Sequence, residues 1–354
     1  MSGFVLPAAA PLHAGAWLCW LGAVLALMTI TRNPLYLGLA LAWIGAVGVA
    51  VGRAPATRPG LPWSPLTFGV VVVPLSALFN GLTVHVGATV LARLPAGWPL
   101  LGGPLTLEAM VYGALNGVAL TGLFAAFAVA NRSVSLRQVI QLIPRAYYPV
   151  ALVVAIAVSF VPATLRQWQQ VREAQAVRGH RMRGWRSWLP LWAPLLTGGL
   201  ERALQLAEAM TARGFAGGPP LHNAWTRAGV LVGLPLAGAG LLLRTVWGQA
   251  LAGALLLVAG AGLVAVAVWL AGRRRPHTRY RPTPWRMAEW VAAAGALITA
   301  GAFLLPLPGM ERSSIFWSPY PALSLPGFAL GLGVATWGLL APAAALMVRN
   351  HDRI

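Results

Sequence analysis

The side chains most able to do chemistry in this sequence fall in two copies of one pattern, E-A-x-x-x-R-G. The first copy is Glu173–Gly179 and the second is Glu208–Gly214. The chain holds only seven acidic residues, so two that recur in one frame with an arginine are informative. An arginine guanidinium is planar, always charged and rich in donors, which suits insertion between polar groups of a partner. We therefore interpret the repeat as a binding feature in which Arg178 and Arg213 make the contact.

Both copies also fit the chemistry of an ordinary helix end. Glycine commonly follows a helix because it tolerates the left-handed backbone there, and a cation in the last turn stabilises the helix dipole by about 0.3–1 kcal/mol. One such ending would need no further explanation, whereas two in the same frame favour a shared role. The residues assigned to that role are Arg178, Gly179, Ala212, Arg213 and Gly214, with Glu173, Ala174, Glu208 and Ala209 supporting them.

Each copy follows a stretch with helical periodicity. Apolar side chains recur at spacings of three and four before both copies, which places them on one face of a helix. They are Leu165, Trp168, Val171 and Ala174 before the first copy, and Leu200, Ala203, Leu204, Ala207 and Met210 before the second. We therefore expect two helices that each end in Arg-Gly.

The rest of the chain has the composition of a membrane protein. Of its 354 residues, 58% are hydrophobic and 9% are charged, whereas soluble proteins carry about 25% charged residues. Apolar stretches long enough to cross a bilayer of about 30 Å recur along the chain. They run near residues 15–30, 34–51, 66–91, 107–130, 139–160, 228–243, 246–271, 290–305 and 325–348. The expected fold is an all-α polytopic membrane protein with about eight transmembrane helices.

The distribution of arginine predicts how these helices are oriented. All 26 basic residues are arginine, and most fall in segments that share one side if both termini are cytoplasmic. The +19 charge is explained by this bias and does not indicate a nucleic-acid partner. The stretch 139–160 carries Pro144, Arg145 and Pro149, so we expect a helix or hairpin embedded at the cytoplasmic interface, with a full crossing as the alternative. The expected location is the cell membrane.

Several classes of site are missing from the sequence. A nucleotide-binding P-loop requires lysine, which this chain lacks, so any ATP hydrolysis must come from another polypeptide. The six histidines are isolated, and no metal or cofactor site is expected. A secondary transporter would show paired interrupted spans, which we do not find. A polytopic membrane enzyme acting on lipid-linked or peptide substrates stays as the alternative, with Glu173 and Glu208 as its available carboxylates.

The two copies and their surroundings resemble a known family. Phe160-Val-Pro162, Arg172–Gly179 and Glu201–Phe215 are similar to the signature region of the EcfT/CbiQ family, the transmembrane T component of energy-coupling factor (ECF) transporters. Val177 stands where the family usually has alanine, and Asn33-Pro34 is a weaker cue of the same family.

The resemblance implies a function and a set of partners. Arg178 and Arg213 would enter grooves on two cytoplasmic ABC ATPases, and a substrate-binding membrane S component would capture a vitamin or transition-metal ion. The chain itself would then be no enzyme. The expected organisation is a four-helix membrane bundle at 1–135, a coupling domain at 136–222, a final family-type helix at 223–245 and extra membrane helices at 246–354. The resemblance covers about residues 10–245 and says nothing of the remainder.

Overall fold

The computed structural model of this chain is dominated by helices, which confirms the expected all-α fold. It describes residues 12–52, 63–95, 102–144, 147–179, 188–215, 224–273, 285–305 and 312–351. The chain divides into two compact units. Unit 1 comprises Met1–Leu142 and Arg281–Ile354, and unit 2 comprises Ile143–Tyr280. Each unit is described by itself.

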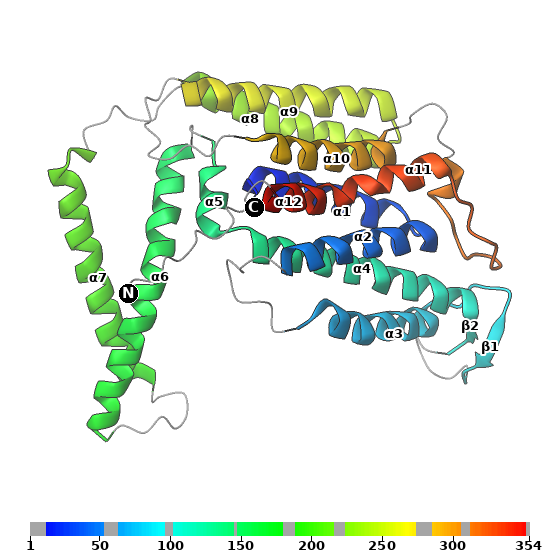
Figure 1. The fold of residues 1–354 in the computed structure, drawn as a ribbon, viewed down its shortest axis with the longest axis horizontal. Helices are drawn as coiled ribbons and strands as arrows, with labels where there is room; N and C mark the ends of the chain where they lie inside the picture. Colours follow the sequence, from blue (N-terminus) through cyan, green and yellow to red (C-terminus); the bar gives the residue numbers. More distant parts are fainter. Residues whose placement is uncertain are drawn as a thin grey trace. The chain divides into compact units, whose positions relative to one another are not determined.

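Unit 1 is a bundle built from both ends of the chain (Figure 1). Its helices pack as α1 on α10, α2 on α4, α3 on α4, and α10 on α12. From the first part of the chain come α1 (Ala14–Ile30), α2 (Pro34–Gly52), α3 (Pro65–Thr83), β1 (Val90–Arg93), β2 (Pro104–Thr106), α4 (Leu107–Ser133) and α5 (Leu136–Gln141). From the last part come α10 (Met287–Leu304), η4 (Arg312–Ser314), α11 (Leu330–Ala335), η5 (Thr336–Leu340) and α12 (Ala341–His351).

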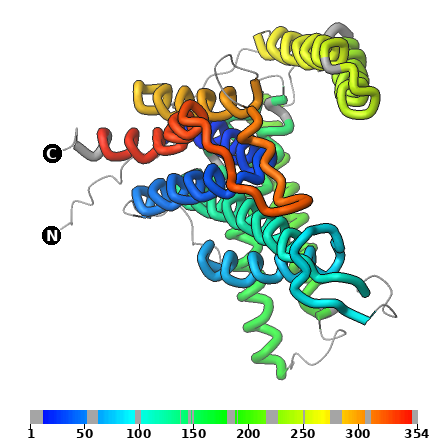
Figure 2. The backbone as a smooth tube through the Cα atoms, turned by 90° about the vertical axis from the view of Figure 1, so that its right-hand side faces the viewer, coloured from blue at the N-terminus to red at the C-terminus, as the bar shows by residue number. Residues whose placement is uncertain are grey.

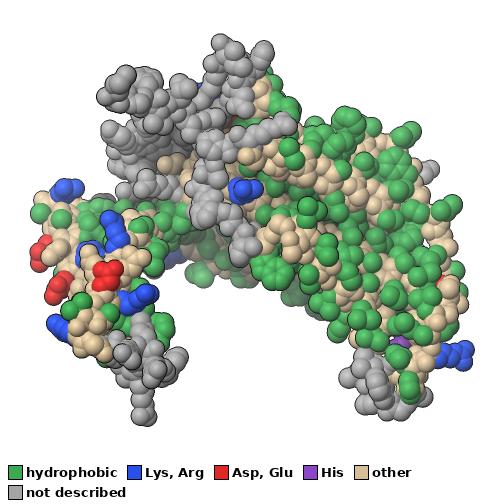
Figure 3. Space-filling view, turned by 60° about the horizontal axis from the view of Figure 1, so that its bottom comes forward, with side chains coloured by type: hydrophobic (Ala, Val, Ile, Leu, Met, Phe, Trp, Pro, Cys, Tyr) green, Lys and Arg blue, Asp and Glu red, His purple; other side chains and the backbone are tan. Residues whose placement is uncertain are grey.

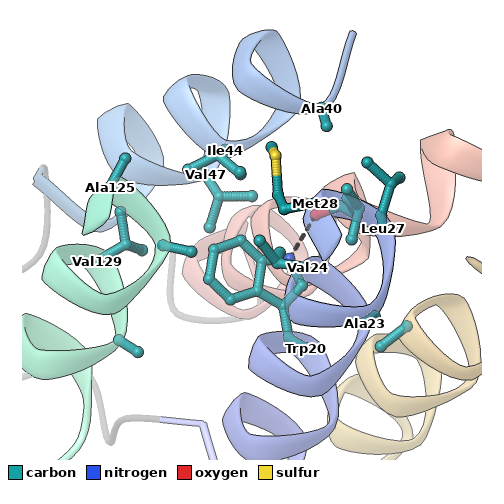
Figure 4. Close-up of a cluster of buried hydrophobic side chains, with 14 of the residues drawn as sticks. Trp20, Ala23, Val24, Leu27, Met28, Ala40, Ile44, Val47, Ala125 and Val129 are labelled. Atoms are coloured by element: carbon teal, nitrogen blue, oxygen red, sulfur yellow. Dashed lines mark hydrogen bonds between the residues drawn. The ribbon is translucent and has the colours of Figure 1, made fainter. Parts of the chain in front are cut away.

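A buried apolar cluster lies at the centre of unit 1. Trp20 of α1 is fully buried, and its indole nitrogen donates to the carbonyl of Leu339 in η5 at 2.9 Å. Figure 4 shows Trp20 among side chains of α2 and α4, including Ile44 and Val129. A buried indole N–H needs an acceptor, so this bond ties the first helix to the C-terminal segment inside the core.

The C-terminal segment is therefore part of the bundle and not a separate addition. Figure 2 shows its orange and red stretch against the blue N-terminal helices. Phe303 of α10, Ile315 and Leu332 are each fully buried in the same core as α1 and α2. The structure thus divides the chain differently from the expected four segments, in which residues 246–354 formed one C-terminal addition. The reason is that α10 covers α1, a pairing far apart in sequence.

Buried polar groups fix the turn between α1 and α2 to this segment. Asn33, with no exposed surface, donates from Nδ2 to the carbonyls of Ser314 at 2.8 Å and Gly327 at 2.7 Å. The hydroxyl of Tyr36 lies 2.9 Å from Ser314 Oγ and accepts from the Ala329 amide at 2.8 Å. Hydrogen bonding of this kind offsets the cost of burying polar atoms, so the turn and the segment hold each other in place.

The expected span at residues 66–91 is shorter in the structure. α3 ends at Thr83, and the chain continues in extended backbone to β1, which pairs antiparallel with β2. Val84 and Val86 are β-branched, which favours this extended form. The buried carboxylate of Glu108, at the start of α4, accepts the Thr89 amide at 3.0 Å and holds the connection against α4.

Unit 2 consists of two helix pairs. These are α6 (Tyr148–Val177) with α7 (Leu189–Ala212), and α8 (Ala224–Thr245) with α9 (Ala250–Arg273). Glycines let α8 and α9 approach closely, since a Cβ on Gly233 would lie 2.9 Å from the Gly260 carbonyl oxygen. The stretch 139–160 is not one continuous helix. α5 ends at Gln141, and α6 then runs continuously from Tyr148 into the first E-A-x-x-x-R-G copy.

Eight helices in the described residues are long and apolar enough to cross a membrane. Their number matches the expectation, but the set differs. The 28-residue stretch Val150–Val177 qualifies by length and composition, whereas Ala14–Ile30, with 17 residues, is shorter than the others. Hydrophobic side chains dominate the visible surface of unit 1 in Figure 3, as lipid contact requires.

Candidate functional site at two Arg-Gly helix ends

The first copy of the repeat closes α6 with a defined backbone geometry. Arg178 is the C-cap, with φ −78° and ψ 9°, and its amide donates to the Ala174 carbonyl at 3.3 Å. Gly179 follows with φ +78°, in the left-handed region, and its amide donates to the Ala176 carbonyl at 3.0 Å. The helix therefore ends by placing Arg178 at its tip and turning the chain sharply at Gly179.

The second copy closes α7 in the same conformation. Arg213 has φ −87° and ψ 8°, its amide donates to the Met210 carbonyl at 3.2 Å, and Gly214 has φ +77°. The expectation of Arg-Gly helix caps is confirmed at both ends. A Cβ on Gly179 or Gly214 would meet nothing within 4 Å, so glycine is needed for its backbone angle and not for space.

Both helix ends are open to contact. Arg178, Gly179, Ala212, Arg213 and Gly214 are all exposed, as are the supporting Glu173, Ala174, Glu208 and Ala209. Val177, which precedes the first arginine, is 89% exposed although it is apolar. Figure 3 shows arginine and acidic side chains gathered on the α6 and α7 part of unit 2, at the left of the view. The surface around each tip is therefore charged, and the structure leaves it uncovered.

The two helices cross as an antiparallel pair (Figure 1). At the crossing, Gln167 of α6 donates from Nε2 to the Pro194 carbonyl of α7 at 3.2 Å. Beside it, the rings of Trp168 and Trp188 stack with centroids 5.5 Å apart. At 1.5 Å per residue, α6 extends about 15 Å beyond Gln167, and α7 extends about 21 Å beyond Gly198. The two Arg-Gly ends thus point away from the crossing in opposite directions and lie up to about 36 Å apart.

Sequence reasoning found the tips but missed the crossing that positions them. The Gly198-Gly199 pair inside the amphipathic α7 was the available signal, because glycine in a helix often marks a close approach. Periodicity alone gave no indication that Gln167 would face it. In the described residues there is no group of three or more His, Cys, Asp or Glu able to hold a metal ion.

Comparison with known proteins places both tips inside a shared region. A family model described as "Cobalt transport protein", CbiQ, matches residues 11–224. The chain belongs to the CbiQ family. The match includes both E-A-x-x-x-R-G copies and ends where α8 begins, so that α9 to α12 lie outside it. With eight helices suited to cross a bilayer, this member is a multi-pass membrane protein.

Several curated relatives carry the name energy-coupling factor transporter transmembrane protein EcfT. The protein from Leuconostoc gelidum is 37% identical over 93 residues, which are 25% of this chain and 35% of the relative. Those from Bacillus selenitireducens and Exiguobacterium sibiricum are 35% and 31% identical, over 20% and 27% of this chain and 29% and 40% of theirs. The alignments span less than half of the relatives' length.

Proposed function

We propose that this CbiQ-family protein is the transmembrane scaffold of an ECF-type importer. In this proposal two partner ABC ATPases bind the ends of α6 and α7, and a substrate-binding membrane subunit captures a vitamin or transition-metal ion. ATP hydrolysis takes place in the partners, and this chain passes their movement to the capture subunit. Both termini and both Arg-Gly ends face the cytoplasm, and residues 136–222 act as the coupling domain.

The observation that carries the proposal is the identical construction of the two helix ends. Each presents an exposed arginine at the C-cap and a left-handed glycine after it, although the two lie on different helices. A separation of up to about 36 Å is too wide for one groove to receive both arginines. Two separate grooves, one on each ATPase, fit this arrangement.

The chemistry of the tips suits a mechanical contact. A guanidinium at a rigid helix end can donate several hydrogen bonds to carboxylates or carbonyls lining a groove. A rigid helix then carries displacement of its tip to the other end, which is how closure of one subunit is transmitted to another. Glu173 and Glu208 lie one to two turns before the tips, and their bracing role stays a prediction.

A third partner is supported by the exposed apolar side chains of α7. Trp192, Leu196, Leu200 and Leu204 follow at intervals of four, and all are at least half exposed. A row of this kind on a helix with charged neighbours requires lipid or an apolar protein surface to cover it. We assign it to the interface shared by the bilayer and the capture subunit.

The test is co-purification with candidate ATPases and measurement of transport-linked ATP hydrolysis. We expect Arg178→Ala and Arg213→Ala each to weaken the complex by removing one contact, and the double variant to abolish it. Arg172→Ala is the matched control, because it removes an exposed arginine of α6 outside the tip. An intact complex with unchanged hydrolysis in the double variant would refute the proposal. Activity of the purified chain alone on a lipid or peptide would favour the membrane-enzyme alternative.

A further inference from the structure

We infer that the contact between Gln167 and Gly198 is the positioning element that sets the span between the two coupling arginines. The inference rests on the proposed function, because it concerns how Arg178 and Arg213 are held for their partners. Neither Gln167 nor Gly198 belongs to a repeat copy, and neither lies near a tip in sequence. Their role follows from where the two helices touch.

The contact between α6 and α7 is confined to a short stretch. α8 and α9 pack closely along their length, whereas α6 meets α7 at Gln167, which bonds to Pro194, and at Trp168, which stacks on Trp188. Beyond the crossing, the α7 side chains Leu200 and Leu204 are 62% and 56% exposed. Among the described residues, the outer part of α7 is therefore largely uncovered, and the crossing is where α6 and α7 hold each other.

Gly198 lies under the side-chain amide of Gln167 at the crossing. A Cβ built on Gly198 would collide with Nε2 of Gln167, whereas one on the adjacent Gly199 would meet nothing within 4 Å. The same Nε2 donates to the Pro194 carbonyl, one turn before Gly198. The Gln167 amide thus lies directly over the glycine and bonds to the neighbouring turn. Any side chain at position 198 must displace that amide or part the helices.

A small change at the crossing becomes a larger one at the tips. The α7 arm beyond Gly198 is about 21 Å long, so a 5° change in crossing angle moves Arg213 by about 2 Å. Hydrogen bonds between a guanidinium and its acceptors tolerate only a few tenths of an ångström around their best distance of about 2.8 Å. A shift of that size would withdraw one arginine from its groove while the other arginine stays bound in its own.

The experiment measures the span directly in the full-length protein. Spin labels on Val177→Cys and Thr211→Cys, with the native Cys19 replaced by alanine, report the distance between the two helix ends by pulsed dipolar spectroscopy. Both positions are exposed. We expect Gly198→Leu to shift this distance by up to about 1–2.5 Å for a 5–10° change of angle, because the distance between the ends changes by less than the longer arm's tip moves. Gly199→Leu makes the same gain in helix propensity and should leave the distance unchanged.

Shortening the opposing side chain provides a second and independent check. Gln167→Ala should broaden the distance distribution, because the amide that holds the crossing is gone. Combined with Gly198→Leu, it should bring the mean distance back toward that of the parent, since the added leucine then has room. The single variant Gln167→Ala does not contain the leucine substitution. It therefore tests the pivot even if Gly198→Leu were poorly expressed.

ATP hydrolysis with the partner ATPases is measured on the same unlabelled variants. We expect Gly198→Leu to lower coupled hydrolysis at least tenfold while Gly199→Leu retains it. Unchanged label distances in Gly198→Leu would overturn the inference and leave the proposed function untouched. A shifted distance with full coupled hydrolysis would show that the span does not matter, which also overturns it. Failure of the proposed function itself would appear separately, as loss of ATPase binding by the parent protein.

Discussion

Substitution of Asn33 tests whether buried hydrogen bonds anchor the C-terminal segment to the family core. Asn33 lies between α1 and α2 with no exposed surface. Its amide nitrogen donates to two carbonyls of the C-terminal segment, those of Ser314 and Gly327, and its Oδ1 accepts the Leu35 amide at 2.9 Å. Asn33→Ala removes all three bonds at once without adding bulk.

The expected loss of stability follows from the groups left behind. A buried donor or acceptor that loses its partner costs about 1–3 kcal/mol. Three groups lose partners here, and water can reach some of them once the segment loosens, so we expect about 3–5 kcal/mol in total. Asn33→Asp keeps the shape and the acceptor for Leu35 but turns a carboxylate toward two carbonyls, so it should be at least as damaging.

Stability is measured by denaturant titration in detergent micelles, and hydrogen exchange localises the effect. We expect amides of residues 312–329 to exchange much faster in Asn33→Ala. Thr29→Ala is the control, because this exposed hydroxyl at the end of α1 bonds only to carbonyls of its own helix. If Asn33→Ala lost no more stability than Thr29→Ala, or if residues 312–329 kept their protection, the anchoring argument would fail.

Two further predictions concern glycines with contrasting surroundings. Gly179→Ala and Gly214→Ala force a residue with a Cβ into φ near +78°, which costs about 1–2 kcal/mol each. Faster hydrogen exchange of the amides in the last turn of α6 or α7 than in the parent protein, at unchanged global stability, would show this cost. Exchange rates equal to those of the parent would contradict it. Gly260→Leu should separate α8 from α9, because a Cβ there meets backbone of Ala237 and Gly233. Gly262→Leu faces open space and should be tolerated, so equal unfolding midpoints for these two variants would be evidence against the close helix pair.

Local features of the sequence predicted the helices and their ends well. Apolar stretches of about 20 residues identified most of the spans, and Arg-Gly predicted both helix caps at the correct residues. These features depend on the chain within a few residues of each position. The extent of α6 was harder to predict, since the apolar half after Tyr148 and the polar half around Arg172 read as two segments. Continuous backbone hydrogen bonding joins the two segments into one helix, and the amino-acid composition does not predict this.

Contacts between distant segments were beyond sequence reasoning. The sequence periodicity predicts neither the Gln167–Gly198 crossing nor the burial of Trp20 against Leu339. Each contact depends on which pairs of helices pack together. The family resemblance did not supply the contact of Trp20 with Leu339 either, since residues beyond 224 fall outside the family match. The sequence marked Asn33-Pro34 as a weak family cue but did not indicate that the Asn33 side chain would be buried against the C-terminal segment.

The packing of α10 changes how the C-terminal third of the chain should be regarded. The aligned 93 residues are 35% of the Leuconostoc relative, which is therefore only about 270 residues long. The family match in this chain ends at residue 224, well before α10 begins at Met287. In this chain α10 covers α1, and residues 314–339 supply the buried hydrogen-bond partners of Trp20, Asn33 and Tyr36. Polar groups without partners are costly within a bilayer. The C-terminal segment is thus needed to complete the bundle of unit 1.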